Sequence, residues 1–315
     1  MSYKKDADLV YRKMNRLDGK VILVTGSGRG FGRGMAYSYA LQGASVISVS
    51  RTVKELKDLE NEIQKKGGEV LTVPTDLTNE EAIHSLRDKV LEKYGRLDAL
   101  VNNAATSPWK LVDDMTSALW DRTIAVNLRA PFLLSKAFLD IMRKQGHGSI
   151  VNVTSGSANR GFIAESAYCP SKYGIEGLTQ CLALELQPHN IAVNTLGVGA
   201  PPGQRLKPTE LTLEEARNMP AEVRDKYADD ESMAETFGDA WAFLALQDAN
   251  GVTGQRLGSR ELAEYLKRNG WEAAVASWRR KLTKAVYVSY DFPKSTGYQT
   301  PDGGAQEHVF IFKKK

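Results

Sequence analysis

Apolar, β-branched runs alternate along the chain with longer stretches whose pattern is typical of helices. The runs occupy residues 20–25, 44–50, 69–75, 97–102, 149–154 and 191–196. Short runs of this kind are typical of strands buried on both faces of a parallel sheet. The stretches between them predict helices over 30–43, 53–66 and 80–94, a helical stretch around Asn127, and a helix with Tyr168 and Lys172. The alternation predicts an α/β fold, a Rossmann-like doubly wound parallel sheet with helices on both faces.

A polar, proline-containing segment of about 199–235 follows the sixth predicted strand, with helical pieces at 213–218 and 220–227. In such sheets the ligand crevice lies beyond the carboxyl ends of the strands, so we expect this segment to cover it as a lid. An ordinary surface insertion is the alternative. A helix over 237–247 and an edge strand at 255–258 follow.

We divide the chain into an N-terminal helical arm (1–16), a catalytic domain (17–258) and an α+β C-terminal extension (259–315). The extension is predicted to contain two helices and a hairpin of two strands, at 259–269, 270–284, 285–290 and 307–312. Three roles stay open for it. We favour an oligomer contact over a lid or a simple thickening of the domain.

Composition narrows the class of protein. The 315 residues are 42% hydrophobic and 25% charged, with a net charge of +4 and no long basic stripe, so we expect no nucleic-acid partner. No run of about 18 apolar residues is present, so we expect no membrane span. Residues 1–16 lack the apolar stretch of a secretory signal, and two cysteines suit a reducing compartment. We expect a cytoplasmic protein, and we predict no metal site.

Two local motifs indicate the chemistry. Thr25-Gly26-x-x-x-Gly30-x-Gly32 joins the first strand to a helix, and its glycines let the backbone approach a pyrophosphate at the helix N-terminus. Tyr168 and Lys172 lie four residues apart, on one face of a helix. A nearby ammonium favours the phenolate, so we expect Lys172 to lower the pKa of Tyr168 toward working pH. Tyr168 would then donate and accept protons.

Together with Asn102-Asn103-Ala104, Asn127 and Ser155, these motifs occur in an order that resembles the short-chain dehydrogenase/reductase family, over about residues 17–258. The resemblance implies that Tyr168 exchanges a proton with the substrate oxygen and that Ser155 hydrogen-bonds it. It implies that Lys172 lowers the pKa of Tyr168 and binds the nicotinamide ribose. Asn127 is implied to hold a water that connects Lys172 to solvent.

The resemblance also implies a nicotinamide cofactor, for which the chain fits the family's NADP(H) pattern. Ser50 ends the second strand, and no Asp or Glu occurs between Ser45 and Lys54. Arg29 and Arg51 could bracket a 2′-phosphate with charge-assisted hydrogen bonds. Asp76 is implied to contact the adenine. The full set of predicted cofactor-binding residues is Gly26, Ser27, Arg29, Gly30, Phe31, Gly32, Ser50, Arg51, Asp76, Leu77, Asn103, Ala104, Tyr168, Lys172 and Val198.

The chain departs from the family pattern at three places. Ala105 stands where the family usually has glycine, and Val198-Gly199 replaces a Pro-Gly pair. The threonine that usually reaches the nicotinamide amide has no counterpart, because prolines and a glycine occupy 201–203. The nicotinamide side of the pocket is therefore expected to differ most from the family.

We expect an NADPH-dependent reductase of a small or medium ketone, or the reverse alcohol dehydrogenase, acting as a homodimer or homotetramer. One alternative is a reductase of thioester-linked 3-oxo groups, with Arg205 and Lys207 as candidates to grip a phosphopantetheine arm. A different class also stays open: a catalytically idle, cofactor-binding scaffold that works through the C-terminal extension.

Overall fold

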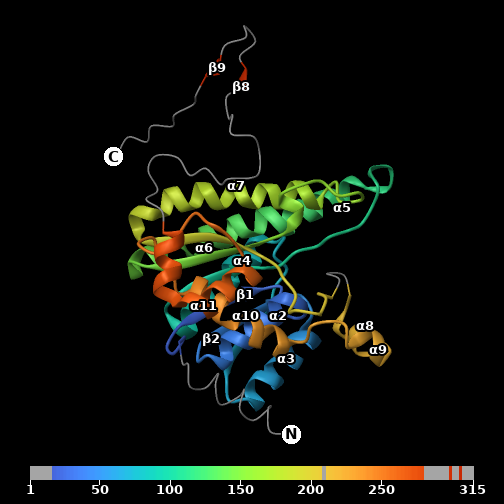
Figure 1. Cartoon of the computed structure of the whole chain (residues 1–315), viewed down its shortest axis with the longest axis horizontal. Helices are drawn as coiled ribbons and strands as arrows, with labels where there is room; N and C mark the ends of the chain where they lie inside the picture. The colour runs from blue at the N-terminus through green and yellow to red at the C-terminus, as the bar shows by residue number, and fades with distance from the viewer. Residues whose placement is uncertain (1–15, 208–210, 280–297, 300–304, 307–315) are drawn as a thin grey trace.

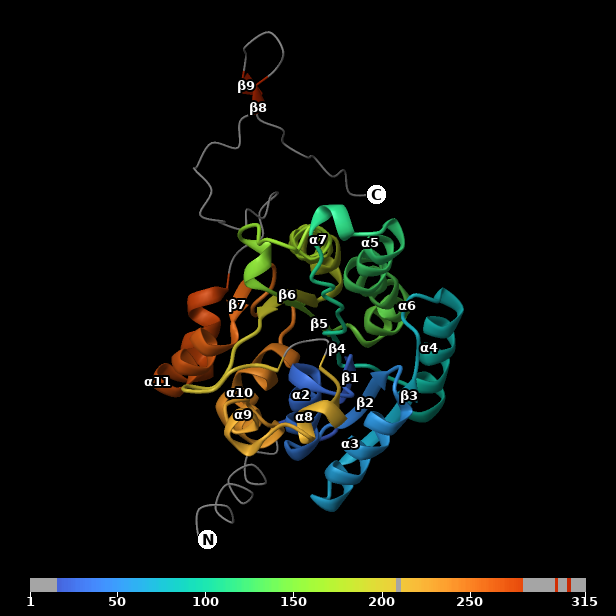
Figure 2. The ribbon, with the colours of Figure 1, turned by 90° about the vertical axis from the view of Figure 1, so that its right-hand side faces the viewer.

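A computed structural model describes residues 16–207, 211–279, 298–299 and 305–306. These residues contain a seven-stranded parallel sheet of order β3-β2-β1-β4-β5-β6-β7 (Figures 1 and 2). Its strands are β1 (Val21–Thr25), β2 (Ser45–Ser50), β3 (Glu69–Pro74), β4 (Ala99–Asn102), β5 (Gly148–Thr154), β6 (Ile191–Gly197) and β7 (Arg256–Gly258). The order reverses between β1 and β4, and this switch point is where doubly wound sheets bind ligands.

Helices cover both faces of the sheet, as the alternating pattern predicts (Figure 2). One hydrophobic core is formed with side chains of α2 (Gly30–Leu41), α3 (Val53–Lys65), α10 (Asp230–Ala245) and α11 (Ser259–Trp278). A second hydrophobic core is formed with side chains of α4 (Glu80–Tyr94), α6 (Ala130–Gln145) and α7 (Tyr168–Leu186). Strand β1 shows why both layers are needed: Ile22 and Val24 join the first core, whereas Val21 and Leu23 join the second.

Three further α-helices of the described residues are shorter than the helices of these two cores. Helix α5 (Ser117–Ile124) continues into a five-residue π-helix, η2 (Ala125–Arg129), and then into α6. Between β6 and α10 lie α8 (Leu213–Arg217) and α9 (Ala221–Arg224). Within the described residues no helix combines the length and apolar character needed to cross a bilayer.

Helix α10 begins earlier than the apolar pattern predicts, at Asp230 instead of residue 237. Asp229 caps it: its Oδ1 accepts from Ser232 N at 2.8 Å, and Ser232 Oγ accepts from Asp229 N at 3.1 Å. A capping box satisfies N–H groups of the first turn, so polar residues can begin a helix before its apolar face does.

The start of the predicted extension packs on the same core. Leu262, Leu266 and Ala274 of α11 are buried with residues of α10. Gly270, with a φ of +79°, bends α11 where we predicted a junction between two helices, but the second part ends at Trp278 and not at 284. The predicted strands 285–290 and 307–312 and nearly all of the N-terminal arm lie outside the described residues. Two-residue strands β8 (Tyr298–Gln299) and β9 (Ala305–Gln306) pair antiparallel between the predicted strands.

Candidate active site

The glycine turn between β1 and α2 forms one wall of a cavity. Gly26 has a φ of +65°, and a Cβ there would lie 2.7 Å from Ala104 Cα, so only glycine allows the turn to pack against the end of β4. Gly30, at φ +59°, has open space where its Cβ would lie. Helix α2 has no side-chain N-cap and no acidic residue in its first turn. This arrangement suits an anionic group such as a pyrophosphate.

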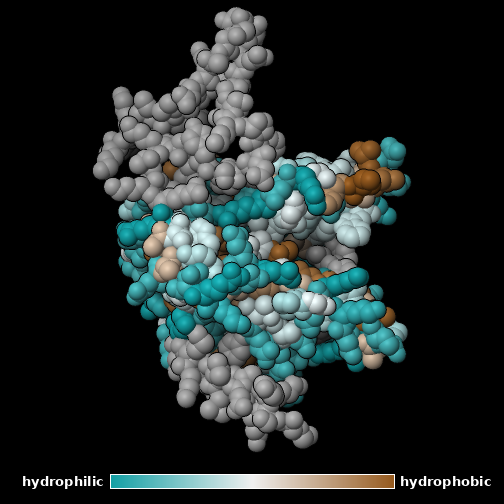
Figure 3. All heavy atoms as spheres, in the orientation of Figure 1, coloured by the Kyte–Doolittle hydropathy of each residue, from teal (hydrophilic) through white to brown (hydrophobic). Residues whose placement is uncertain are grey.

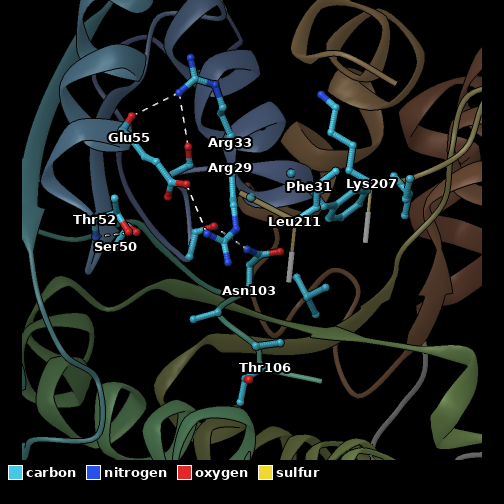
Figure 4. Close-up of a pocket in the computed structure, with 18 of the residues that line it drawn as sticks. Arg29, Phe31, Arg33, Ser50, Thr52, Glu55, Asn103, Thr106, Lys207 and Leu211 are labelled. Carbon is cyan, nitrogen blue, oxygen red and sulfur yellow. Dashed lines mark hydrogen bonds and ion pairs between the residues drawn. The ribbon is translucent and has the colours of Figure 1, made fainter. Parts of the chain in front are cut away.

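The cavity has a volume of about 390 Å³ and opens in a hollow between α5 and the α8–α9 segment (Figure 3). Most of the predicted cofactor-binding residues line it: Gly26, Arg29, Gly30, Phe31, Gly32, Ser50, Arg51, Asp76, Leu77, Asn103, Ala104, Tyr168, Lys172 and Val198. Leu206, Lys207, Leu211 and Thr212 of the predicted lid line it too. Figure 4 shows Lys207 and Leu211 across the cavity from Ser50 and Glu55.

Ser27 differs from the other predicted cofactor residues, because its hydroxyl is directed into the protein. Ser27 Oγ lies 2.7 Å from Ser48 Oγ and accepts from Val49 N at 2.9 Å. The side chain therefore fastens the glycine turn to β2.

The end of β4 is tied to the glycine turn by Thr25 and Asn103. Thr25 Oγ1 accepts from Asn103 N at 3.0 Å and from Ala104 N at 3.1 Å, and Asn103 Nδ2 donates to Thr25 O at 2.9 Å. These bonds explain the position of the Asn-Asn-Ala motif: it joins two strand ends on either side of the switch point.

Sequence reasoning missed an acidic residue at the predicted 2′-phosphate site. Glu55, in the first turn of α3, is buried, and its Oε1 lies 3.3 Å from Arg29 Nη1 (Figure 4). A Cβ on Gly28 would lie 2.7 Å from Glu55 Oε2 and 2.9 Å from Ser50 Oγ, so the carboxylate lies close to the end of β2. The stretch without an acid from Ser45 ends at Lys54, one residue before Glu55. A sequence signal for Glu55 does exist: it is an acid in the first turn of the helix that follows the second strand.

Arg51 and Asp76 complete this end of the cavity. Asp76 Oδ1 accepts from Thr78 N at 3.0 Å and from Thr78 Oγ1 at 2.8 Å. The backbone hydrogen bond from Thr78, helped by the charge of Arg51, lowers the pKa of Asp76. Asp76 is therefore an ionised acceptor on the cavity wall.

Tyr168 and Lys172 lie at the N-terminal end of α7, and Ser155 lies at the end of β5. The Ser155 hydroxyl lies within hydrogen-bonding reach of the Tyr168 phenol, so the strand end and the helix end meet here. The predicted pKa of Tyr168 was wrong in direction: burial raises it to about 12, and the Ser155 bond offsets this only in part. Lys172 Nζ donates to Val153 O at 2.9 Å and lies 5.5 Å from the centroid of the Tyr168 ring. Desolvation is therefore the largest influence on the pKa of the phenol, and the nearby Glu165 raises this pKa further.

Lys172 itself is only 3% exposed. Burial lowers the pKa of Lys172 to about 8. The carboxylate of Glu176, one turn further along α7, opposes this effect, because its negative charge raises the same pKa. The ammonium thus titrates close to physiological pH, which a lysine on the surface does not.

Asn127 lies in the π-helix η2, a departure from α-helical bonding that often marks functional sites. Its Nδ2 donates to Thr106 O at 2.9 Å and to Ser171 Oγ at 3.0 Å, and its Oδ1 accepts from Thr106 N at 2.8 Å. The side chain therefore holds the loop after β4 against α7. Both of its N–H groups are used, so a water would have to donate to an oxygen of Asn127.

The α8 helix is held by ion pairs to α3, which follows β2. Lys54 Nζ lies 2.8 Å from Glu214 Oε2, and Arg217 Nη2 lies 2.7 Å from Asp58 Oδ2. Asp58 also binds the buried Arg33, which is 2.8 Å away. The segment after β6 is thereby connected to the helix whose N-terminal part borders the cavity.

Fold and site together define a Rossmann-type oxidoreductase, and comparisons with known proteins agree. The model of a family described as short chain dehydrogenase matches residues 20–207. The chain belongs to the short-chain dehydrogenase/reductase family, whose members act on CH–OH and C=O groups.

Relatives of several activities resemble the chain at similar levels. A 3-oxoacyl-[acyl-carrier-protein] reductase of Thermotoga maritima is 34% identical over 77% of this chain and 97% of its own length. A 7alpha-hydroxysteroid dehydrogenase of Clostridium sardiniense is 33% identical over 81% of this chain and 100% of its own. The similarity therefore shows the family without choosing among these substrates.

Among solved structures, a metagenomic short-chain oxidoreductase in complex with NADP has a TM-score of 0.63 and 32% identity, covering 77% of this chain and 97% of its own. A putative NAD(P)-dependent gluconate 5-dehydrogenase of Beutenbergia cavernae with bound NADP has a TM-score of 0.65 and 31% identity, covering 82% of this chain and 99% of its own.

Proposed function

We propose that this protein is an NADP(H)-dependent oxidoreductase that interconverts a carbonyl and a secondary alcohol, with Tyr168 as the general acid and base. The observation that carries the proposal is the presence of Tyr168 and Lys172 on the wall of the cavity formed by the glycine turn, with Ser155 beside Tyr168. A proton donor, an oxygen-binding hydroxyl and a cation are then placed where a carbonyl oxygen would gain charge.

The roles follow from the chemistry of each side chain. The nicotinamide would supply or accept the hydride. In the direction of reduction, the Tyr168 phenol donates its proton to the carbonyl oxygen, and Ser155 Oγ donates a hydrogen bond to the same oxygen. A phenol whose pKa is about 12 stays protonated at neutral pH, which suits the acid role.

Lys172 supports this transfer through its charge. Its Nζ lies beside the Tyr168 ring and would stabilise the phenolate that forms when the proton leaves. Its pKa of about 8 leaves it mostly protonated at neutral pH. Asn127 holds the loop after β4 and Ser171 in place, and we propose that one of its oxygens binds the water that returns a proton to Lys172.

The preference for NADP(H) rests on Arg29 and Arg51 at the wall of the cavity near Ser50. Support comes from the relatives solved with NADP. Glu55 modifies this proposal, because its carboxylate pairs with Arg29 and would repel a 2′-phosphate. We propose that a bound 2′-phosphate competes with Glu55 for Arg29.

A second candidate is the reduction of a 3-oxoacyl thioester. It is favoured by the relative from Thermotoga maritima and by cations on the cavity wall at Arg122, Lys207 and Arg224. A phosphopantetheine arm carries a phosphate that such cations would bind.

The test has two arms. The purified protein is titrated with NADPH and NADH by fluorescence, and NADPH oxidation is followed with ethyl acetoacetate, cyclohexanone and acetoacetyl-coenzyme A. We expect Tyr168→Phe to bind NADPH like the wild type and to lose at least about a thousandfold in kcat. A Tyr168→Phe variant with full reductase activity would refute the assignment. Binding of NADPH without turnover of any carbonyl compound would favour the scaffold class.

A further inference from the structure

An ion pair between a buried acid and a mostly buried arginine lies next to Ser155, and neither residue lines the cofactor cavity. Glu176 is 1% exposed, and its Oε1 lies 3.3 Å from Arg256 Nη1. Glu176 Oε2 accepts from Thr195 Oγ1 at 2.9 Å. Arg256 and Thr195 are register partners on β7 and β6, so the pair joins α7 to two adjacent strands of the sheet.

Both members of the pair also reach a residue of the site. Arg256 Nη2 donates to the backbone carbonyl of Ser155 at 2.8 Å. Glu176 lies one helical turn after Lys172 and two turns after Tyr168, on the same face of α7. One guanidinium and one carboxylate thus connect the strand end that carries Ser155 with the helix that carries Tyr168 and Lys172.

The burial of this pair is difficult to explain by stability alone. Two charges taken out of water are seldom better than apolar side chains of the same size, because desolvation opposes their attraction. The guanidinium donates through Nη2 to the Ser155 carbonyl while its Nη1 faces Glu176, and a single ammonium does not reproduce these two directions at once.

We propose that Glu176 and Arg256 are positioning residues for the reaction: Arg256 fixes Ser155 through its carbonyl, and Glu176 holds Arg256 and supplies negative charge to Lys172. This inference rests on the proposed function, in which Ser155 binds the substrate oxygen. Neither residue touches the cavity, so each acts through the residue that it contacts.

The surroundings of Lys172 make the role of Glu176 measurable. Tyr168 and Glu176 face Lys172 from α7 itself, Arg256 of β7 approaches through Glu176, and Arg122 of α5 lies on the cavity wall. The β5 strand contributes the Val153 carbonyl, which Lys172 contacts, and η2 contributes the Asn127 amide, which bonds the neighbouring Ser171; neither group titrates in this range. The attraction of Glu176 raises the pKa of Lys172.

The first measurement follows the proposal without any substrate. Protein with ¹³C-labelled lysine is titrated by NMR, and the Lys172 signal is assigned by its loss in Lys172→Met. In Glu176→Gln we expect Lys172 to lose its proton at lower pH than in the wild type. Glu185→Gln, an exposed acid further along α7, is the matched control and should leave the titration unchanged. An unchanged titration in Glu176→Gln would overturn the role given to Glu176.

The second measurement uses NADPH oxidation with ethyl acetoacetate. In Arg256→Met we expect kcat to fall about a hundredfold with NADPH affinity unchanged, because a small displacement of Ser155 misplaces the substrate oxygen. Arg256→Lys should recover part of the loss. The apolar double variant Glu176→Leu/Arg256→Met keeps the site filled and should fold, yet it should stay slow. The surface pair Glu264→Gln/Arg268→Met, at 3.0 Å on α11, is the control.

The outcomes separate the two proposals. A folded double variant with the wild-type kcat would overturn the positioning role of Arg256. A wild-type protein that reduces no carbonyl compound, but whose Lys172 titration still depends on Glu176, would overturn the proposed function and keep the coupling of Glu176 to Lys172.

Discussion

Glu55 and Arg29 form an ion pair of 3.3 Å at the wall of the cofactor cavity, next to Ser50. The pair places a buried carboxylate beside the predicted 2′-phosphate site, where the end of β2 itself carries no acid. The preference between NADPH and NADH then depends on whether the positive charge of Arg29 or the negative charge of Glu55 faces the adenosine ribose.

Replacing Glu55 should sharpen the preference for NADPH. In Glu55→Gln the repulsion of a 2′-phosphate is lost and Arg29 no longer has a carboxylate partner at this position. We expect the ratio of NADH to NADPH dissociation constants to rise about tenfold, or 1.4 kcal/mol. Fluorescence titration measures both constants. Glu60→Gln on the same helix is the control, and an equal ratio in wild type and Glu55→Gln would contradict this prediction.

Removing both arginines should have the opposite effect. In Arg29→Ala/Arg51→Ala the charge-assisted hydrogen bonds to a 2′-phosphate are lost, so NADPH should bind no better than NADH. The same titration checks this. Retention of the wild-type ratio would move both arginines to a surface role.

Lys172 should make stability depend on pH in a defined window. Burial lowers its pKa from 10.5 to about 8 in the folded protein. Between these values the unfolded chain binds more protons than the folded one, so raising the pH stabilises the fold. Below about pH 8 the buried charge costs roughly 3 kcal/mol, which is recovered as pH rises toward 10.

Urea unfolding of the wild type and Lys172→Met at pH 7.5 and 9.5 measures this difference. The wild type should gain free energy of unfolding relative to Lys172→Met at the higher pH. Lys89→Met, an exposed lysine on α4, should show no such change relative to the wild type. If the difference in free energy of unfolding between the wild type and Lys172→Met is the same at both pH values, the lowered pKa of Lys172 is contradicted.

Arg33 should be a major contributor to stability although it is not part of the proposed chemistry. It is 2% exposed and lies within 2.6 to 2.8 Å of Asp58, Glu62 and Asp230, so it joins α2, α3 and α10. Arg33→Met would leave these acids without their shared cation. We expect a loss of about 3 kcal/mol in the free energy of unfolding. Thermal and urea unfolding measure this loss, with Arg87→Met as the control, because Arg87 is paired only with its neighbour in sequence, Asp88, among the ion pairs described. An equal loss of unfolding free energy in Arg33→Met and Arg87→Met would contradict the prediction.

The sequence by itself determined the fold class, and most of the cofactor-binding residues predicted from it line one cavity. Buried strands of a parallel sheet have a local apolar pattern, and the glycine turn, Asn103, Ser155, Tyr168 and Lys172 follow one another at spacings that local structure imposes. Strand ends meet at one edge of such a sheet, so these residues could be expected to converge.

Only the tertiary structure decided the electrostatics of the site. The pKa of Tyr168 depends on how completely the surrounding chain excludes water, and the spacing to Lys172 carries no information on that. Glu55 returns to the cavity because α3 packs against the glycine turn, and Arg256 reaches Ser155 across 101 residues of chain. Burial and long-range contacts arise from packing between elements, whereas a sequence pattern reports mainly the conformation within each element.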